Sequence, residues 1–283
     1  MEFWRDDFRI LLTSWLLGLG LMSGLAQDRP NILLIMADDL GYSDLGSYGG
    51  EIDTPHLNRL AANGLRFTDF YNTGRCCPSR ASLLTGLYPH QTGMGWMTAA
   101  DLQLPAYQGE LNESSATIAE VLSSAGYGTY MTGKWHLTRY DHEQAQANKS
   151  SWPRQRGFDQ FYGSMRGGNY FAPDTLTKDN ERISPTSEGY FYTDAISAAT
   201  QGYLQEHHKA TTNKPLFCYV AYTAPHFPLH APEQDIAKYR ERYARGWDAL
   251  RQERYDRMRQ MRLLEPQWKL PPRPESVPAW GTV

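Results

Sequence analysis

The chain has few cysteines, little net charge and no long apolar run, and each shortage excludes a class of protein. Three cysteines in 283 residues exclude a disulfide-rich framework and leave one thiol over if two of them pair. A formal net charge of −3 gives no overall attraction to nucleic acid or to an anionic membrane. The chain is 41% hydrophobic and 13% aromatic, which is enough to bury the core of a large α/β domain.

The first 26 residues have the features of a targeting segment. Ile10 to Leu25 is uncharged and mostly apolar, and Gly24 and Ala26 place small residues at the −3 and −1 positions of a cleavage site. The run is shorter than the roughly 20 residues that a membrane-spanning helix needs, so a cleaved signal peptide (1–26) is favoured over a retained membrane anchor. We therefore expect an exported protein, periplasmic or secreted, with no stable membrane insertion after cleavage.

Residues 74–86 (GRCCPSRASLLTG) are interpreted as a loop that leads into a short helix. Pro78 suits the first helical position and the final glycine suits the left-handed position after the last turn. Cys76 then lies just ahead of a helix N-terminus, where free N–H groups favour an anion, and Arg80 adds planar donors for an oxyanion. A bridge to Cys77 would be strained, and zinc needs more ligands than this stretch supplies. A reactive side chain beside an anion site is favoured, and a plain thiolate nucleophile stays open.

Three segments rich in apolar side chains predict strands of a parallel sheet: residues 31–37, 128–132 and 216–222. The first reads as a strand covered on both faces. Polar side chains follow each strand: Asp38 and Asp39, then Lys134 and His136, then His226. The lysine and histidine are two residues apart on an extended segment and are expected to project the same way. Because open α/β sheets bind ligands beyond the carboxyl ends of their strands, these side chains are expected to meet in one crevice.

Asp38 and Asp39 are adjacent carboxylates, which repel each other unless a cation lies beside them. Their hard oxygen atoms favour calcium or magnesium over a metal that prefers thiolates. The alternative is a strand-to-loop turn with two solvated acids. Cys218, inside the third strand, is predicted to be a small buried apolar residue.

Three further segments have the spacing of helices: residues 54–63, 117–126 and 235–263. The residues expected to face inward are Leu57, Leu60 and Ala61 in the first, and Ile118, Val121, Leu122 and Ala125 in the second. The third is expected to break at Gly246. Residues 65–68 are predicted to form a strand, and residues 170–188 an irregular excursion near the substrate opening.

Cys76-x-Pro78-Ser79-Arg80, followed by Leu83-Leu84-Thr85-Gly86, resembles the signature of type I sulfatases (arylsulfatases), within the alkaline-phosphatase-like superfamily. Three other stretches resemble motifs of the same family: DDLG at 38–41, GKWHL at 133–137 and APH at 224–226. The resemblance runs from about Arg29 to the end of the chain. It implies an α/β fold with a mostly parallel central sheet flanked by helices.

The resemblance also implies a chemistry, the hydrolysis of sulfate esters by an enzyme of the arylsulfatase type. In the family the first cysteine of the signature is oxidised to formylglycine (3-oxoalanine) by a formylglycine-generating or sulfatase-maturating enzyme, and the hydrated aldehyde is the nucleophile. By resemblance the catalytic residues are Cys76, Arg80, Lys134, His136 and His226, and the metal ligands are Asp38, Asp39 and the oxidised Cys76. The metal implied is Ca²⁺, with Mg²⁺ as the alternative. The substrate implied is a sulfated small molecule or carbohydrate, and no nucleic acid.

The family's later motifs do not follow: a strand that ends in an Asp-Asn pair, another active-site lysine and a small C-terminal domain. We therefore expect residues 27–283 to be the N-terminal portion of a sulfatase catalytic domain, whose sheet lacks strands and exposes an edge. Calcium takes roughly six to eight oxygen ligands, more than the three implied positions supply. Two alternatives stay open: hydrolysis of phosphonates or phosphate monoesters at the same site, and a catalytically inactive truncated fragment.

Overall fold

The computed structural model describes residues 29–144, 146–185, 187–210 and 213–283, and the chain from Leu33 onward forms one compact unit. The predicted targeting segment, residues 1–26, lies outside the described residues. Within the described part of the chain, no helix is both long enough and apolar enough to cross a membrane.

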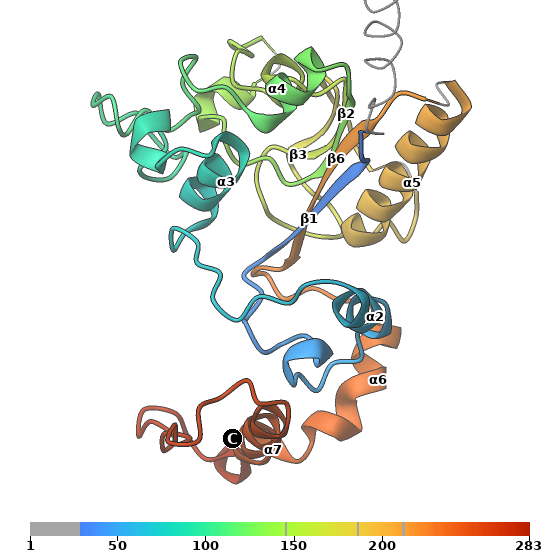
Figure 1. Ribbon diagram of the computed structural model, residues 1–283. Helices are drawn as coiled ribbons and strands as arrows, with labels where there is room; N and C mark the ends of the chain where they lie inside the picture. Colours follow the sequence, from blue (N-terminus) through green and yellow to red (C-terminus); the bar gives the residue numbers. More distant parts are fainter. Residues whose placement is uncertain (1–28, 145, 186, 211–212) are drawn as a thin grey trace, which may run out of the picture. The chain divides into compact units, whose positions relative to one another are not determined.

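Six strands form one sheet in the order β1-β6-β2-β3-β4-β5 (Figure 1). Their bounds are β1 (Ile32–Asp38), β2 (Gly128–Gly133), β3 (Gln160–Ser164), β4 (Leu176–Lys178), β5 (Glu181–Arg182) and β6 (Leu216–Pro225). Strands β6, β2 and β3 run parallel, whereas β4 and β5 add an antiparallel hairpin at one edge. The predicted mostly parallel sheet and its three predicted strands are confirmed.

The register of the parallel strands brings their carboxyl ends to one edge of the sheet. Gly133, the last residue of β2, pairs with Ala221 of β6, and Thr132 pairs with Tyr162 of β3. The segments that follow these strands therefore emerge side by side, as the rule for open α/β sheets requires.

Among the described residues, six α-helices accompany the sheet: α2 (Pro55–Asn63), α3 (Cys76–Thr85), α4 (Ile118–Ser124), α5 (Tyr192–Ala210), α6 (Glu233–Tyr243) and α7 (Gly246–Gln260). Figure 1 shows α5 on one side of the sheet and α3 and α4 on the other. The predicted break at Gly246 is confirmed, because α6 ends at Tyr243 and α7 begins at the glycine.

Alternation along β6 builds a core on each face of the sheet. Cys218 and Val220 belong to the cluster that contains Ile196 of α5, so Cys218 is a buried apolar residue as predicted. Phe217 points the other way and stacks on Phe158 with ring centroids 6.0 Å apart. Two-faced burial of this kind is what a central parallel strand requires.

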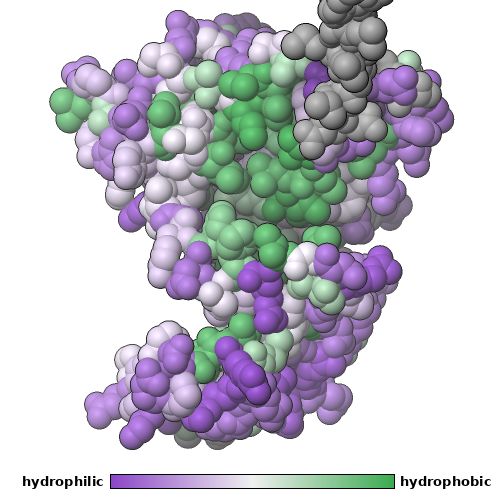
Figure 2. All heavy atoms as spheres, viewed as in Figure 1, coloured by the Kyte–Doolittle hydropathy of each residue, from purple (hydrophilic) through white to green (hydrophobic). Residues whose placement is uncertain are grey.

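The prediction that the first strand is covered on both faces is wrong. Strand β1 lies at the end of the sheet, and Leu33 and Ile35 expose about half of their surface, 51% and 49%. Figure 2 shows apolar side chains gathered on the face of the molecule where β1 lies. The apolar run thus indicated a strand correctly. It did not reveal that the strand lies at the edge of the sheet, where it has a partner on one side only. The predicted exposed edge is present.

The inward faces predicted for two helices are also wrong in part. Leu57 and Leu60 of α2 are exposed, and all nine residues of that helix, each of them described, are exposed or half-buried. In α4 the buried residue is Ala119, whereas Val121 is 55% exposed. The predicted capping box, between Thr117 and Glu120, is present. Residues 65–68 form no strand, although all are described.

Helix α5 was not anticipated, although its buried positions have helical spacing. They are Tyr192, Ile196, Thr200, Tyr203 and His207. Two of these five are polar, which weakens an apolar pattern, and their polar atoms are paired inside the fold. Thr200 Oγ1 bonds Thr132 Oγ1 at 2.7 Å, and His207 Nδ1 bonds the Tyr130 hydroxyl at 2.9 Å.

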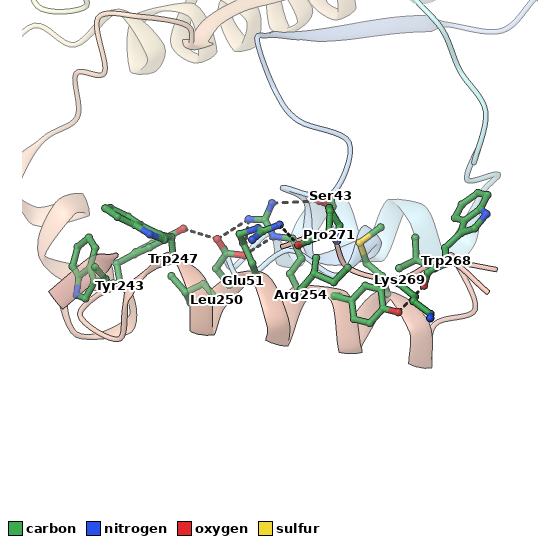
Figure 3. A pocket seen from close by; sticks show the side chains of 15 residues that line it. Ser43, Glu51, Tyr243, Trp247, Leu250, Arg254, Trp268, Lys269 and Pro271 are labelled. Atoms are coloured by element: carbon green, nitrogen blue, oxygen red, sulfur yellow. Dashed lines mark hydrogen bonds and ion pairs between the residues drawn. The ribbon is translucent and has the colours of Figure 1, made fainter. Parts of the chain in front are cut away.

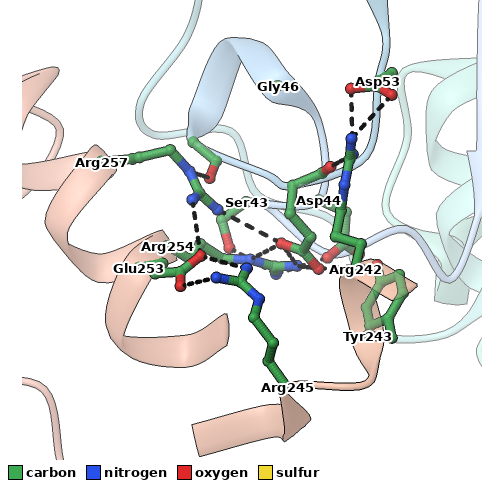
Figure 4. A network of polar contacts seen from close by, with 12 residues as sticks. Ser43, Asp44, Gly46, Asp53, Arg242, Tyr243, Arg245, Glu253, Arg254 and Arg257 are labelled. Carbon is green, nitrogen blue, oxygen red and sulfur yellow. Dashed lines mark hydrogen bonds and ion pairs between the residues drawn. The ribbon is translucent and has the colours of Figure 1, made fainter. Parts of the chain in front are cut away.

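A charged network joins α7 to the loop that follows the two adjacent aspartates (Figure 4). Arg254 donates from Nε and Nη2 to the carboxylate of Glu51 at 2.6–2.9 Å, and from Nη1 to Asp44 at 2.8 Å. The Tyr243 hydroxyl also donates to Glu51, at 3.0 Å. Burial raises the pKa of Glu51, but these hydrogen bonds outweigh it and hold the pKa below its usual value. Glu51 is therefore an ionised anchor for α7.

Beside this network lies a cavity of about 610 Å³ between α7 and the segment from Leu264 to Trp280. Its walls are mainly apolar and include the aromatic side chains of Trp247 and Trp268 (Figure 3). The residues of this larger cavity are not those of the four sequence motifs, so the chemistry has to be sought elsewhere.

We predict that Glu51→Gln lowers the free energy of unfolding by about 2 kcal/mol, because Arg254 loses a charged partner that is largely shielded from water. Urea denaturation measures this loss. The pKa of Glu51 is lowered in the folded state, so its contribution is present above the unfolded value of 4.5 and is lost as the pH falls below it. The difference between wild type and variant should therefore shrink in acid.

Glu253→Gln is the matched control, because Glu253 pairs with Arg245 at a more exposed site. This change should cost less than about 1 kcal/mol. Equal losses for the two variants would contradict the anchoring role of Glu51.

Candidate active site

Helix α3 carries the cysteine motif, and it begins two residues earlier than predicted. Cys76 is its first residue and Arg75 its N-cap, so Pro78 is the third helical residue and not the first. Proline is tolerated there because the N–H groups of the first turn have no intrahelical partner. Gly86 ends the helix in the left-handed conformation (φ 70°) and donates to Ser82 O, as predicted. Cys76 is thus placed in the N-terminal turn, where an anion is favoured.

Three soft ligands meet at this turn: Cys76, Cys77 and His136, whose ligand atoms all lie within 4.8 Å of one another. The hydrogen bond from the Cys77 thiol, and then the one from His136, hold the pKa of Cys76 well below its usual range although burial opposes them. The same bond and burial raise the pKa of Cys77. Burial lowers the pKa of His136, partly offset by Cys76, so the ring is neutral and can accept a proton.

The segment after β2 is held by backbone bonds to both neighbouring strands. Lys134 N donates to Ala221 O of β6 at 2.8 Å, and His136 N donates to Met165 O, just beyond β3, at 2.9 Å. His136 has φ 59°, in the left-handed region. The prediction that this segment is extended through His136 is therefore wrong. Lys134 and His136 nevertheless face one cavity, because the turn at His136 re-aims its ring.

Thr138 has a structural role that the sequence did not reveal. Its hydroxyl accepts from Trp135 Nε1 at 3.0 Å and donates to Ser151 O at 2.9 Å. Both side chains are fully buried. These hydrogen bonds fix the Trp135 indole, which lies in the chain between Lys134 and His136. They thereby limit the motion of the two functional side chains.

Asp38 is the centre of a buried ionic cluster. Its carboxylate is 2.5 Å from Lys134 Nζ and 3.4 Å from Arg80 Nη2, and all three side chains are at most 4% exposed. Arg80 Nη1 also donates to Lys134 O at 2.6 Å and to the Tyr219 hydroxyl at 3.3 Å. Arg80 therefore acts on the site through Asp38 and Lys134.

Asp39 and His226 form a second, more open pair. Asp39 has φ 60° and a side chain that is 64% exposed, and its Oδ2 lies 3.6 Å from His226 Nε2. His226 Nδ1 is 2.5 Å from the carbonyl of Phe227, which can only accept, so Nδ1 carries the proton and Nε2 is the nitrogen that faces Asp39. Tyr170, not anticipated from the sequence, holds this loop by donating to the carbonyls of Thr223 and His226 at 3.0 and 2.7 Å.

One cavity of about 540 Å³ collects the predicted side chains. Cys76, Lys134, His136 and His226 line it, whereas Asp38, Asp39 and Arg80 lie behind them, in contact with Lys134 or His226. The structure thus brings all seven predicted residues together, and their roles stay predictions. Four polar wall residues were not predicted as site residues: Tyr140, Arg166, Asn169 and Asp174. Arg166 and Asn169 directly follow β3, so the strand-end rule that found the others would have found them too.

The two aspartates fit a hard cation in chemistry but not in number. Asp38 and Asp39 offer carboxylate oxygens, as Ca²⁺ and Mg²⁺ prefer, and the ammonium group of Lys134 already lies 2.5 Å from Asp38. Calcium needs roughly six to eight oxygens, so among the described residues these two would hold an ion from one side only.

Residues 30–264 match the sequence model of a protein family described as Sulfatase. The chain belongs to the sulfatase family. It is 32% identical to an arylsulfatase of Klebsiella aerogenes over 260 residues, which cover 87% of this chain and 53% of that protein. It is 34% identical to the N-acetylgalactosamine-6-sulfatase of Rattus norvegicus over 263 residues, which cover 86% of this sulfatase chain and 48% of the rat protein.

A solved structure shares the fold. The crystal structure of Ps i-CgsB in complex with k-i-k-neocarrahexaose matches with a TM-score of 0.65 and 29% identity, over 81% of this chain and 51% of that one. The predicted family and fold are confirmed. This sulfatase chain spans about half the length of the curated relatives it matches. The activity of the whole protein is therefore a matter of proposal.

We predict that iodoacetamide alkylates Cys76 at about pH 6 in protein whose cysteine has not been converted, because the thiolate is the reactive form. Because the pKa of Cys76 is lowered, its thiolate is present at this pH. Cys218, whose pKa burial raises to about 12, is the internal control. Peptide mass spectrometry measures both sites. Equal modification of the two cysteines would contradict the electrostatic account of the site.

His136→Ala tests the cause of the lowered pKa. The substitution removes one hydrogen-bond donor to the Cys76 sulfur, so the pKa read from the pH dependence of the alkylation rate should rise. His208→Ala, at the end of α5, is the control and should leave the rate as in wild type.

Proposed function

We propose that this protein hydrolyses sulfate esters, as a sulfuric ester hydrolase of the arylsulfatase type. The observation that carries the proposal is the meeting of Cys76, Lys134, His136 and His226 on the wall of one cavity. These side chains come from the ends of two parallel strands and from the first turn of α3. Transfer of a sulfuryl group requires a nucleophile, cationic donors and a base around one cavity, and these side chains supply all three.

Positive charge at the cavity wall would bind the sulfate group. Lys134 Nζ reaches both Asp38 and the cavity, and the N–H groups of the first turn of α3 surround Cys76. Arg80 and Asp38 behind the wall fix the ammonium group, so the lysine is oriented before substrate arrives. Such preorganised donors stabilise charge that develops on the oxygens in the transition state.

Two groups that the chain does not itself encode would complete the site. Oxidation of Cys76 to formylglycine by a maturating enzyme would supply a hydrated aldehyde as the nucleophile, and a calcium or magnesium ion held by Asp38 and Asp39 would supply further positive charge. His136, neutral and in contact with residue 76, would accept a proton there. His226, with Nε2 facing Asp39, would hold and deliver a proton to the departing oxygen.

The relatives suggest which esters to test first. One relative is named an arylsulfatase and another an N-acetylgalactosamine-6-sulfatase, so aryl and carbohydrate sulfates are the proposed substrates. Export to the periplasm or the exterior is proposed from the apolar first 26 residues of the sequence.

We predict turnover of p-nitrophenyl sulfate, with kcat/KM at least about tenfold above that for p-nitrophenyl phosphate, when the protein is produced together with a maturating enzyme. Intact-mass analysis of the Cys76 peptide checks the conversion of thiol to aldehyde. Chelation of divalent ions should lower the rate. A preference for the phosphate ester would replace this function by phosphate monoester hydrolysis, and a converted protein without turnover would support an inactive fragment.

Cys76→Ala and Cys218→Ala form the matched pair for this test. The first removes the side chain at the cavity and should abolish turnover, whereas the second removes a sulfur that lies inside β6, away from the cavity. Loss of activity in both variants would point to damage of the fold and not to loss of a nucleophile.

A further inference from the structure

The wall of the catalytic cavity also carries a polar pair outside the four sequence motifs, Arg166 and Asp174. Both side chains line the catalytic cavity, and both also line an adjoining polar cavity of about 390 Å³. The reaction proposed above uses neither of them. They come from the segment between β3 and β4, which joins the parallel part of the sheet to the hairpin.

Arg166 is held in one orientation by groups that leave its outer edge accessible. Its Nε is 2.9 Å from the carboxylate of Glu143, which is 1% exposed, and its guanidinium carbon lies 4.5 Å from the centre of the Tyr140 ring. Nη2 approaches Asp174 only at 3.5 Å, the outer limit of a hydrogen bond. An arginine fixed in this way loses little freedom when a ligand binds.

The accessible edge offers a donor and an acceptor side by side. Asp174 is 68% exposed and contributes carboxylate oxygens, whereas the half-buried Arg166 contributes N–H groups. Two neighbouring hydroxyl groups match this pair, because one accepts from the guanidinium while the other donates to the carboxylate. A second anionic group matches it less well, because the exposed carboxylate of Asp174 beside Arg166 would repel it.

We propose that Arg166 and Asp174 bind two adjacent hydroxyl groups of the sugar ring that carries the scissile sulfate, and so select sulfated carbohydrates over esters without hydroxyls. This inference rests on the proposed function, since it places the sulfate at Lys134 and His226 in the same cavity. An ester without hydroxyls that covers the pair would displace water from it and offer no hydrogen bonds in return. Such an ester would therefore bind less tightly than a sugar sulfate. Arg166 and Asp174 are specificity residues and take no part in the bond cleavage.

The test is isothermal titration of the chain with three kinds of probe. The first is a panel of methyl pyranoside monosulfates that differ in the sulfated carbon, the second is cyclohexylmethyl sulfate, and the third is sodium sulfate. Cyclohexylmethyl sulfate has a six-membered ring and a sulfate ester but no hydroxyls, so it isolates their contribution. Binding is measured directly, and turnover is not needed.

Arg166→Ala and Asp174→Asn should each weaken binding of the best pyranoside sulfate by about 10–100-fold. The same variants should change binding of cyclohexylmethyl sulfate less than threefold. Arg154→Ala is the matched control, because Arg154 pairs with Asp179 at 3.4 Å and lies on neither cavity wall among the residues described. It should bind every probe as wild type does.

Three results would overturn the inference. If wild type binds the best pyranoside sulfate no more tightly than cyclohexylmethyl sulfate, the pair does not read hydroxyls, although binding of both esters leaves the proposed function standing. If a methyl pyranoside disulfate, titrated alongside these probes, binds best and Asp174→Asn tightens it, the pair is an anion site. If wild type binds neither sodium sulfate nor any ester, the proposed function fails as well.

Discussion

The buried carboxylate of Asp38 is the interaction on which the site depends. It meets Lys134 and Arg80 with all three side chains nearly inaccessible to water, and Arg80 in turn contacts Tyr219. The cluster therefore ties the end of β1 to α3, to the end of β2 and to β6. Charges of this kind cost several kcal/mol each to bury and are tolerated only as a matched set, so the geometry of the set is strongly constrained.

Around this cluster the strands of the sheet fix the positions of the loops, and the loops carry the functional side chains. The parallel register of β6, β2 and β3 brings three strand ends to one edge, and every group that lines the catalytic end of the cavity emerges there or from the first turn of α3. Two residues at this edge, Asp39 and His136, have left-handed backbone conformations. Such conformations cost energy, and the bonds from neighbouring strands hold the His136 segment in place.

The half of the molecule near α7 has a different character. A second cavity with aromatic walls and the Glu51–Arg254 network lie there, and both are separate from the reacting groups. The apolar side chains of β1 and α2 are also exposed. A sheet edge with exposed leucines and isoleucines is a surface that proteins usually cover.

The sequence by itself determined the family and the three strands that carry the motifs, and it predicted seven site residues that the structure brings together. It could do so because short motifs and strand ends are local features of the chain. Only the tertiary structure decided burial and contact: that β1 is an edge strand, that Arg80 lies behind Lys134, and that Thr138 and Tyr170 hold the functional loops. It also placed Arg166 and Asp174 at the cavity. These facts depend on which distant segments pack together, and an apolar run has the same composition whether one face or both are covered.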